Sequence, residues 1–491
     1  MQLVAYGAQD VYLTGNPQIT FFKVVYRRHT NFAVEAIEQT FNGSVDFNKK
    51  TDVQITRNGD LITKMYLKAT LESSYTEQTV QLADSTQETI AVKTAAAATV
   101  AAGDISLTVV AGVGGAAGFL RITDNNNAGS MDTTNFAVGK VVQISASAAG
   151  GNDGYYIVRI RNSDDEIVVT PLAAGATSAN DGTAIVTAHD NVEWVEQVGH
   201  AMIKSVELQI GGTKIDKHYG EWLHIWQELA RTTHTKAVAE IIGDANRRKT
   251  RTLFVPLQFF CCRNDGLALP LIALQYHDVR VSFEMNTAAN CCSSGATTAS
   301  ISNASLLVDY IYLDSEERKR FAQASHEYLI EQLQYTGAET GVVGQGNKFR
   351  LNFNHPCKEL VWVVRKGDDD TANKFVNFTS NDVIADGENT VDDAQLQLNG
   401  HDRMSKQSGK YFQNVQVLQH HSHSPANPGI NVYSFALNAE EHQPSGTCNF
   451  SRIDNAQLNM KLNTAGDVHI FATSYNVLRI MSGMGGLAYS N

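Results

Sequence analysis

The sequence has few charged residues and no excess of basic ones. Charged side chains make up 18% of the 491 residues, and the formal net charge is -12. Because an acidic chain repels phosphate, direct nucleic-acid binding is not expected. Low charge combined with 37 glycines is typical of strands and turns and not of long surface helices.

The sequence also lacks a secretion signal and a membrane-spanning run. Its start, Met1 to Tyr6, has neither a basic segment nor an apolar segment of the signal-peptide kind. The most apolar stretch, Thr94 to Leu120, is too rich in glycine and too polar to span a membrane. The six cysteines include two adjacent pairs, which is not the spacing of a secreted disulfide framework. We therefore expect reduced thiols and a soluble protein made in a reducing compartment.

Enzyme signatures are missing as well. The sequence contains no Walker A loop, no His-Glu-x-x-His and no Gly-x-Ser-x-Gly motif. His420, His421 and His423, with His401 nearby, could in principle bind a metal, but their polar, proline-containing setting predicts an exposed loop instead. We therefore predict no catalytic, cofactor or metal site, and a protein that is not an enzyme.

The strongest positive signal is that of short strands. The segment from Asp52 to Thr56 alternates apolar and polar residues, a turn follows, and Leu61 to Leu71 continues as strand. Helical patterns are few. One covers Trp222 to Ala230, and another begins at the capping residue Asp314 and continues to Ala324.

The two halves of the chain look like copies of one β-domain. Leu208 to Gly212 recurs as Leu396 to Gly400, and each is followed by a polar segment that ends in aromatic residues. The number and spacing of strands in each half predict a sandwich or jelly roll. Between about residues 76 and 190 the composition changes, and recurrent β-branched runs favour an inserted β-module over a long disordered loop. Insertions succeed at exposed loop tips, so this module should face outward.

Seven segments spread along the whole chain carry a family resemblance: Leu3 to Pro17, Gln18 to Phe32, Arg57 to Ile62, Ile215 to Tyr219, Leu267 to His277, Gln443 to Asn455 and Tyr475 to Tyr489. These segments resemble the major capsid proteins of nucleocytoplasmic large DNA viruses, in particular those of algal viruses and giant viruses of protists.

The resemblance implies an all-β fold of two tandem eight-stranded jelly rolls, a double jelly roll, with a small inserted β-module in the first. It divides the chain into an N-terminal arm (1–25), a first roll (26–313, with the module at about 76–190), a linker helix (314–325) and a second roll (326–491). It further implies a homotrimer with a pseudo-hexagonal outline that tiles the icosahedral shell of a large double-stranded DNA virus, after synthesis and assembly in the host cytoplasm.

The resemblance also implies several binding partners. These are other copies of the chain, neighbouring capsomers, minor capsid and penton proteins, and the internal viral membrane, reached through the arm. In the arm the candidate contact residues are Tyr6, Tyr12, Phe21 and Phe22. Farther along, the aromatic residues Trp222, Trp226, Phe259 and Phe260 could serve either a subunit interface or the core.

Short sequence motifs mark Asn42, Asn303 and Asn377 as candidate glycosylation sites, whereas Asn449 lies in a strand-like block and is expected to be unmodified. Two other classes of function remain open because a fold does not fix a function. One is a monomeric carbohydrate-binding sandwich, and the other is a cupin-type enzyme, which would need a clustered His/Glu metal site. The extended motif match favours the capsid protein.

Overall fold

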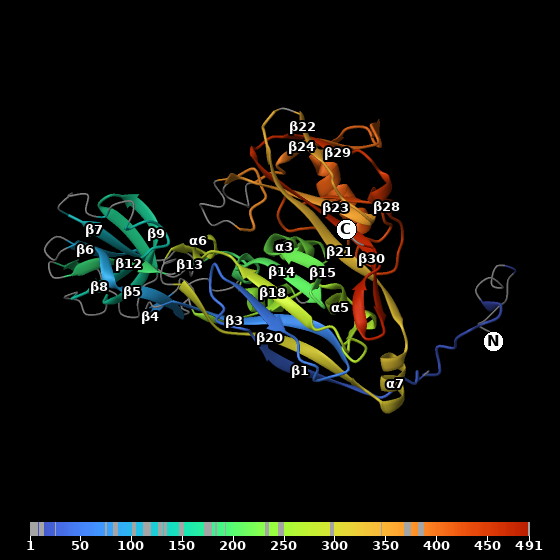
Figure 1. Ribbon diagram of the computed structural model, residues 1–491. Helices are drawn as coiled ribbons and strands as arrows, with labels where there is room; N and C mark the ends of the chain where they lie inside the picture. The colour runs from blue at the N-terminus through green and yellow to red at the C-terminus, as the bar shows by residue number, and fades with distance from the viewer. Residues whose placement is uncertain are drawn as a thin grey trace, which may run out of the picture.

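The structure is a computed structural model, and it describes most of the chain (Figure 1). The described residues are 8, 14–24, 26–73, 76–81, 87–100, 105–110, 119–125, 131, 135–146, 152–170, 179–181, 184–191, 193–230, 235–243, 250–294, 299–344, 346–367, 375–381 and 387–489.

The first half forms two packed sheets. One sheet has the order β1-β20-β3-β16, with the short β17 also paired to β3, and the other has the order β15-β14-β18-β2. The strands are β1 (Phe32–Thr40), β2 (Lys50–Gln54), β3 (Leu61–Ser73), β14 (Ile203–Ile210), β15 (Thr213–Tyr219), β16 (Arg251–Pro256), β17 (Leu269–Pro270), β18 (Val279–Met285) and β20 (Ala299–Leu313).

The second half repeats this order. One sheet runs β21-β30-β23-β27, with β28 and β31 paired at its sides, and the other runs β22-β29-β24-β25, with β26 also paired to β24. The strands are β21 (His326–Gly341), β22 (Gly346–Arg350), β23 (Pro356–Arg365), β24 (Val391–Leu398), β25 (His401–Asp402), β26 (Gln407–Ser408), β27 (Asn431–Ser434), β28 (Cys448–Asn449), β29 (Ala456–Leu462), β30 (Gly466–Met481) and β31 (Met484–Leu487).

Counted along each half, the principal strands pair as first-eighth-third-sixth in one sheet and second-seventh-fourth-fifth in the other. This order is that of a jelly roll, in which two Greek keys fold into facing sheets. The predicted fold class, all-β with two tandem jelly rolls, is therefore confirmed. Each roll has its own core, which contains Leu67 and Phe283 in the first and Trp362 and Leu458 in the second.

Between β3 and β14 the chain forms a separate nine-stranded sheet, seen at the left of Figure 1. This inserted module has its own core, in which Phe136, Ile122 and Val169 are completely buried. Its strands are β4 (Thr76–Gln81), β5 (Gln87–Val100), β6 (Ile105–Val110), β7 (Phe119–Asp124), β8 (Val141–Ser145), β9 (Gly154–Ser163), β10 (Glu166–Thr170), β11 (Ala179–Asp181) and β12 (Ile185–Asn191).

The remaining described elements are short. A two-stranded ribbon joins β13 (Glu193–Trp194) to β19 (Cys292–Ser294). The helices are α2 (Val198–Ala201), α3 (Gly220–Leu229), α4 (Thr235–Ile242), α5 (Phe260–Arg263), η1 (Asp265–Leu267), α6 (Ala288–Cys291), α7 (Ser315–Gln323), the π-helical turn η4 (Tyr411–Val415), α9 (Gln416–His420) and η5 (Phe450–Arg452). The helices predicted over Trp222 to Ala230 and from Asp314 to Ala324 are confirmed as α3 and α7, and the Asp314 side chain accepts a hydrogen bond from the Ser315 amide.

A glycine sets the close approach of the helix that follows the fifth strand in each roll. A Cβ atom on Gly220 would lie 2.4 Å from the carbonyl oxygen of Ile203, the first residue of β14. A Cβ atom on Gly409 would lie 2.0 Å from the carbonyl oxygen of Val391, the first residue of β24. The fourth strand of each roll is thus touched at the same place, so α3 and the segment 411–420 are equivalent elements.

We expect Gly220→Ala to destabilise the protein by about 1–3 kcal/mol, the usual range for overpacking. The added methyl group would meet the backbone, which cannot move aside as a flexible side chain can, and this clash exceeds the gain in helix propensity of about 1 kcal/mol. Denaturant unfolding would measure the change. Gly346→Ala is the control, because a Cβ atom there meets nothing within 4 Å. Equal stability of the two variants would contradict the prediction.

Candidate functional site: the seam between the two rolls

The helix α3 of the first roll packs onto the outer face of a sheet of the second roll (Figure 1). Trp222, Ile225, Trp226 and Leu229 recur at helical spacing and are buried. They pack in one cluster with Val361 and Val363 of β23, Phe471 of β30 and Val432 of β27. Burying each large apolar side chain contributes roughly 1.5–3 kcal/mol. We call this contact, with the polar contacts beside it, the seam.

An ion-pair cluster lies at one end of the seam. The Glu221 carboxylate of α3 accepts a hydrogen bond of 2.6 Å from Arg365 at the end of β23, and it lies 3.0 Å from the His469 ring. Burial disfavours the charge on Glu221, but the hydrogen bond from His469 and the charges of His469 and Arg365 outweigh it and lower the pKa of Glu221 to about 2. Glu221 is therefore an anion held between two groups of the other roll.

A second cluster lies near the other end of α3. Arg263 of α5 donates to Glu331 of β21 over 3.0 Å, and its guanidinium stacks 3.7 Å from the centre of the Trp226 ring. Lys358, whose side chain is buried, donates to the same Glu331 carboxylate over 2.7 Å. Burial opposes ionisation of Glu331, but the hydrogen bond from His442 and the nearby Arg263 and Lys358 charges keep its pKa low.

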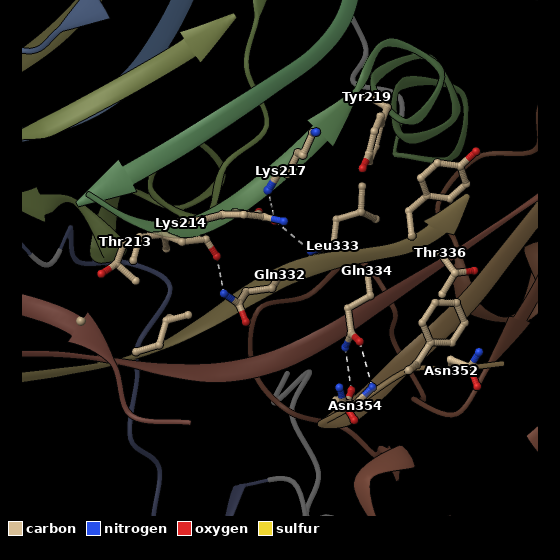
Figure 2. Close-up of a pocket in the computed structure, with 16 residues that line it drawn as sticks. Thr213, Lys214, Lys217, Tyr219, Gln332, Leu333, Gln334, Thr336, Asn352 and Asn354 are labelled. Atoms are coloured by element: carbon tan, nitrogen blue, oxygen red, sulfur yellow. Dashed lines mark hydrogen bonds between the residues drawn. The ribbon is translucent and has the colours of Figure 1, made fainter. Parts of the chain in front are cut away.

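Two sheet edges meet between these clusters. The edge strand β15 of the first roll faces the edge strand β21 of the second. The Leu333 amide donates to Asp216 over 3.0 Å, and the Gln332 side chain donates to the Ile215 carbonyl. A groove of about 590 Å³ lies beside this contact, lined by Lys214 and Lys217 from β15 and by polar side chains of β21. Figure 2 shows these lining residues.

The seam continues along the ends of the long strands β21 and β30. Ile330, Leu478 and Ile480 belong to the second roll by sequence, yet they pack in the core cluster of the first. The packing of α3, the contact between β15 and β21, and the ends of β21 and β30 together hold one roll against the other. The four aromatic residues singled out from the sequence divide accordingly, because Trp222 and Trp226 lie in the seam while Phe259 and Phe260 pack in the first core.

The prediction of an exposed histidine loop is wrong for His421. Its side chain is fully buried, 3.0 Å from Glu359 and 3.2 Å from Glu440. Burial opposes protonation, but the Glu359 charge and the hydrogen bonds to both carboxylates raise the pKa of His421 to about 9. The histidine is thus a structural cation that neutralises two acids. Its neighbour His423 is exposed, as predicted.

The prediction that Asn377 could carry a glycan is also wrong for the folded chain. Asn377 is completely buried, and its amide donates to the Asn381 carbonyl while its side-chain oxygen accepts from Thr379. Asn42 and Asn303 are exposed and stay predictions. In the arm, Phe21 and Phe22 are 89% and 99% exposed, whereas Tyr6 and Tyr12 lie outside the described residues.

Within the part of the chain that the structure describes, no group of three or more His, Cys, Asp or Glu side chains is placed to hold a metal ion, and no helix has the length and apolar character of a membrane span. All six cysteines are free thiols. The seam holds charged groups, but each of the charges described above pairs with another across or beside the contact between rolls. The seam is thus an interface between the two rolls, held by apolar packing and by paired charges.

Comparison with known proteins identifies the family. Residues 317–486 match the family described as large eukaryotic DNA virus major capsid protein, and residues 20–112 and 130–314 match the major capsid protein N-terminus. The major capsid protein of Pyramimonas orientalis virus is 41% identical over 524 residues, which cover 100% of this chain and 99% of that protein. That of Paramecium bursaria Chlorella virus 1 is 34% identical, again over 100% and 99%.

Solved structures agree. The quasi-atomic model of the PBCV-1 virus capsid matches with a TM-score of 0.65 and 30% identity, over 96% of this chain and 100% of that one. The Faustovirus major capsid protein, at 13% identity and a TM-score of 0.61, shares the fold over 97% and 94%. The chain belongs to the family of major capsid proteins of large eukaryotic DNA viruses. It is a structural component of the virion that builds the capsid, and it is not an enzyme.

We expect Glu221→Gln to lower the free energy of unfolding by about 3 kcal/mol, because removing one partner of a buried ion pair leaves the other charge uncompensated. The matched control is Glu327→Gln, which breaks the exposed pair of Glu327 with Arg479 and should change stability by less than about 1 kcal/mol. Denaturant unfolding at pH 7 would compare the two. Equal losses would show that the seam charges contribute no more than a surface pair.

We expect the stability contributed by His421 to decrease with rising pH. Its pKa is higher in the folded chain, about 9, than the ordinary value of 6.5, so the contribution is complete below pH 6.5 and is lost as the pH rises to about 9. Each pH unit in this window removes up to about 1.4 kcal/mol. The measurement is the difference in unfolding free energy between the wild type and His421→Gln, with His423→Gln as control. A difference that does not change with pH would contradict the assignment.

Proposed function

We propose that three copies of the chain form a capsomer with a pseudo-hexagonal outline, and that these capsomers tile the icosahedral shell. The observation that carries this proposal is the repetition of one strand order in two rolls held at a fixed angle by the seam. Three copies of a two-wedge chain give six similar wedges around one axis while obeying only three-fold symmetry. The proposed units are the arm (1–25), the first roll (26–313), the linker helix (314–325) and the second roll (326–491).

The inserted module faces the outside of the shell in this proposal, and the arm faces the inside. The pairing of the long strands supports this orientation. Phe32, where β1 begins after the arm, pairs with Leu313, whereas Ser73, where β3 ends before the module, pairs with Ala299 at the opposite end of β20. The arm and the module therefore leave the first roll at opposite ends, as Figure 1 shows.

The arm is suited to contacts with other components of the virion. Phe21 and Phe22 are exposed next to the basic residues Lys23, Arg27 and Arg28. Apolar and basic side chains together fit minor capsid proteins, penton proteins or the anionic surface of an internal membrane. Assembly takes place in the host cytoplasm, and the free cysteines fit that reducing compartment.

The native mass of the full chain, measured by light scattering after size exclusion, tests the proposal, and we expect three copies. We also expect three copies for a chain in which residues 76–190 are replaced by a short Gly-Ser linker, with the mass lowered by that of three modules. Thr76 of β4 and Asn191 of β12 pair with Val92 of β5 from opposite sides. Two strand spacings therefore separate the ends of the module, roughly 10 Å, which a short linker can bridge.

A monomer of the full chain at every concentration would contradict the trimer. A trimeric full chain with a monomeric deletion variant would contradict the outward placement of the module, since the module would then belong to the assembly contact. Circular dichroism of the deletion variant would show that both rolls remain folded.

A further inference from the structure

A small cavity lies between the two rolls, beside the seam. Its volume is about 10 Å³, enough for one water molecule and for nothing larger. From the first roll it is lined by His218 of β15, Trp222 of α3 and Arg263 of α5, and from the second roll by Glu331 of β21 and Thr473 of β30, among others. The cavity is therefore a space for one small molecule inside the contact between the rolls.

Three side chains of this lining carry a nitrogen atom that has no hydrogen-bond partner among the described residues. The atoms are Nδ1 of His218, Nε1 of Trp222 and Nε of Arg263. His218 is 2% and Trp222 is 1% exposed, so neither of these two nitrogens reaches bulk water. Buried polar atoms in proteins are nearly always hydrogen-bonded, either to protein groups or to ordered water. The lining therefore favours a ligand that forms hydrogen bonds.

The three nitrogens define what this ligand must do. Trp222 Nε1 and Arg263 Nε each carry a hydrogen and can only donate. The other ring nitrogen of His218, Nε2, lies 2.8 Å from the Asp216 carboxylate, which accepts its hydrogen. In the neutral ring Nδ1 is then an acceptor. A molecule bound to all three must accept two hydrogen bonds and donate one, as water does.

Ions match the site poorly. A cation would lie against the N–H hydrogens of Trp222 and Arg263, and across the described ranges no group of three or more His, Cys, Asp or Glu side chains is placed to hold a metal. An anion would lie near the carboxylates of Asp216 and Glu331, whose charges are already paired with His218 and Arg263. The remaining class is a neutral molecule that both donates and accepts.

The site also completes a chain of hydrogen bonds that begins and ends on β21. The Leu333 amide donates to Asp216, and Asp216 accepts a second hydrogen bond from His218. On the other side of the cavity, Arg263 donates to Glu331. Glu331 and Leu333 are two residues apart on β21. A molecule between His218 and Arg263 joins these two polar contacts into one network across the two rolls.

We propose that one water molecule is bound between His218, Trp222 and Arg263 as a structural part of the contact between the rolls. It accepts hydrogen bonds from Trp222 Nε1 and Arg263 Nε and donates one to His218 Nδ1. These three residues belong to the first roll, and β21 and β30 of the second roll line the other side, so the water is enclosed when the rolls come together. The inference does not depend on the proposed trimer, because one chain forms the whole site.

The direct test is a density map of the full chain, from crystals or from electron cryo-microscopy, at a resolution that shows ordered water. We expect one peak per chain at about 2.7–3.2 Å from both His218 Nδ1 and Trp222 Nε1. A map with ordered water elsewhere but no peak here would overturn the inference. So would a peak surrounded by oxygen ligands at about 2.3–2.6 Å, which would identify a cation.

Vibrational spectroscopy of the tryptophans gives a second readout in solution, with Trp362 as the matched control. Trp362 Nε1 is likewise buried and has no partner in the described part of the chain, but Trp362 packs in the second core and does not line the cavity. Difference spectra of the wild type against Trp222→Phe and against Trp362→Phe isolate the indole N–H band of each residue. We expect the Trp222 band to be shifted to the position of a hydrogen-bonded indole, and the Trp362 band to be that of a free one.

A free indole band for Trp222, equal to that of Trp362, would overturn the inference. The density map needs no variant, so it decides the question even where a substitution impairs folding. Neither result bears on the number of copies in the assembly, so failure of this inference and failure of the proposed trimer are separate outcomes.

Discussion

The packing of α3 onto the second roll is the contact on which the rest of the molecule depends. A jelly roll buries one face of each sheet by itself, but β23 is buried on both faces because Trp222 and Trp226 cover the outer one. This second layer turns two separate sandwiches into one body. A subunit of a regular shell needs such a fixed arrangement, since a flexible joint between the two rolls would leave the angle between them undefined.

The buried charges of the seam define the angle between the two rolls more than they stabilise the fold. Replacing a buried ion pair with apolar groups is often neutral or stabilising, so Glu221, Glu331 and their partners are weak evidence for stability alone. Their geometry is restrictive, however. Glu221 must meet both Arg365 and His469 of the other roll. Glu331, which already pairs with Lys358 of its own roll, must also meet Arg263 of the first roll. A rotation of one roll would bury several charges without partners, which makes other orientations costly.

The sequence predicted the fold class, the duplication, α3 and the family, because these depend on local patterns and long motifs. It did not predict the buried charges. Lys358 and Glu359 interrupt the apolar run of β23 and were a visible signal, but their partners Glu331 and His421 lie 27 and 62 residues away in the chain. The polar context predicted an exposed loop at His421, and a short sequence motif marked Asn377 as a candidate glycosylation site. The side chain of His421 is instead buried and hydrogen-bonded to Glu359, 62 residues away in the chain. Asn377 is buried as well, but its hydrogen bonds go to the nearby residues Thr379 and Asn381.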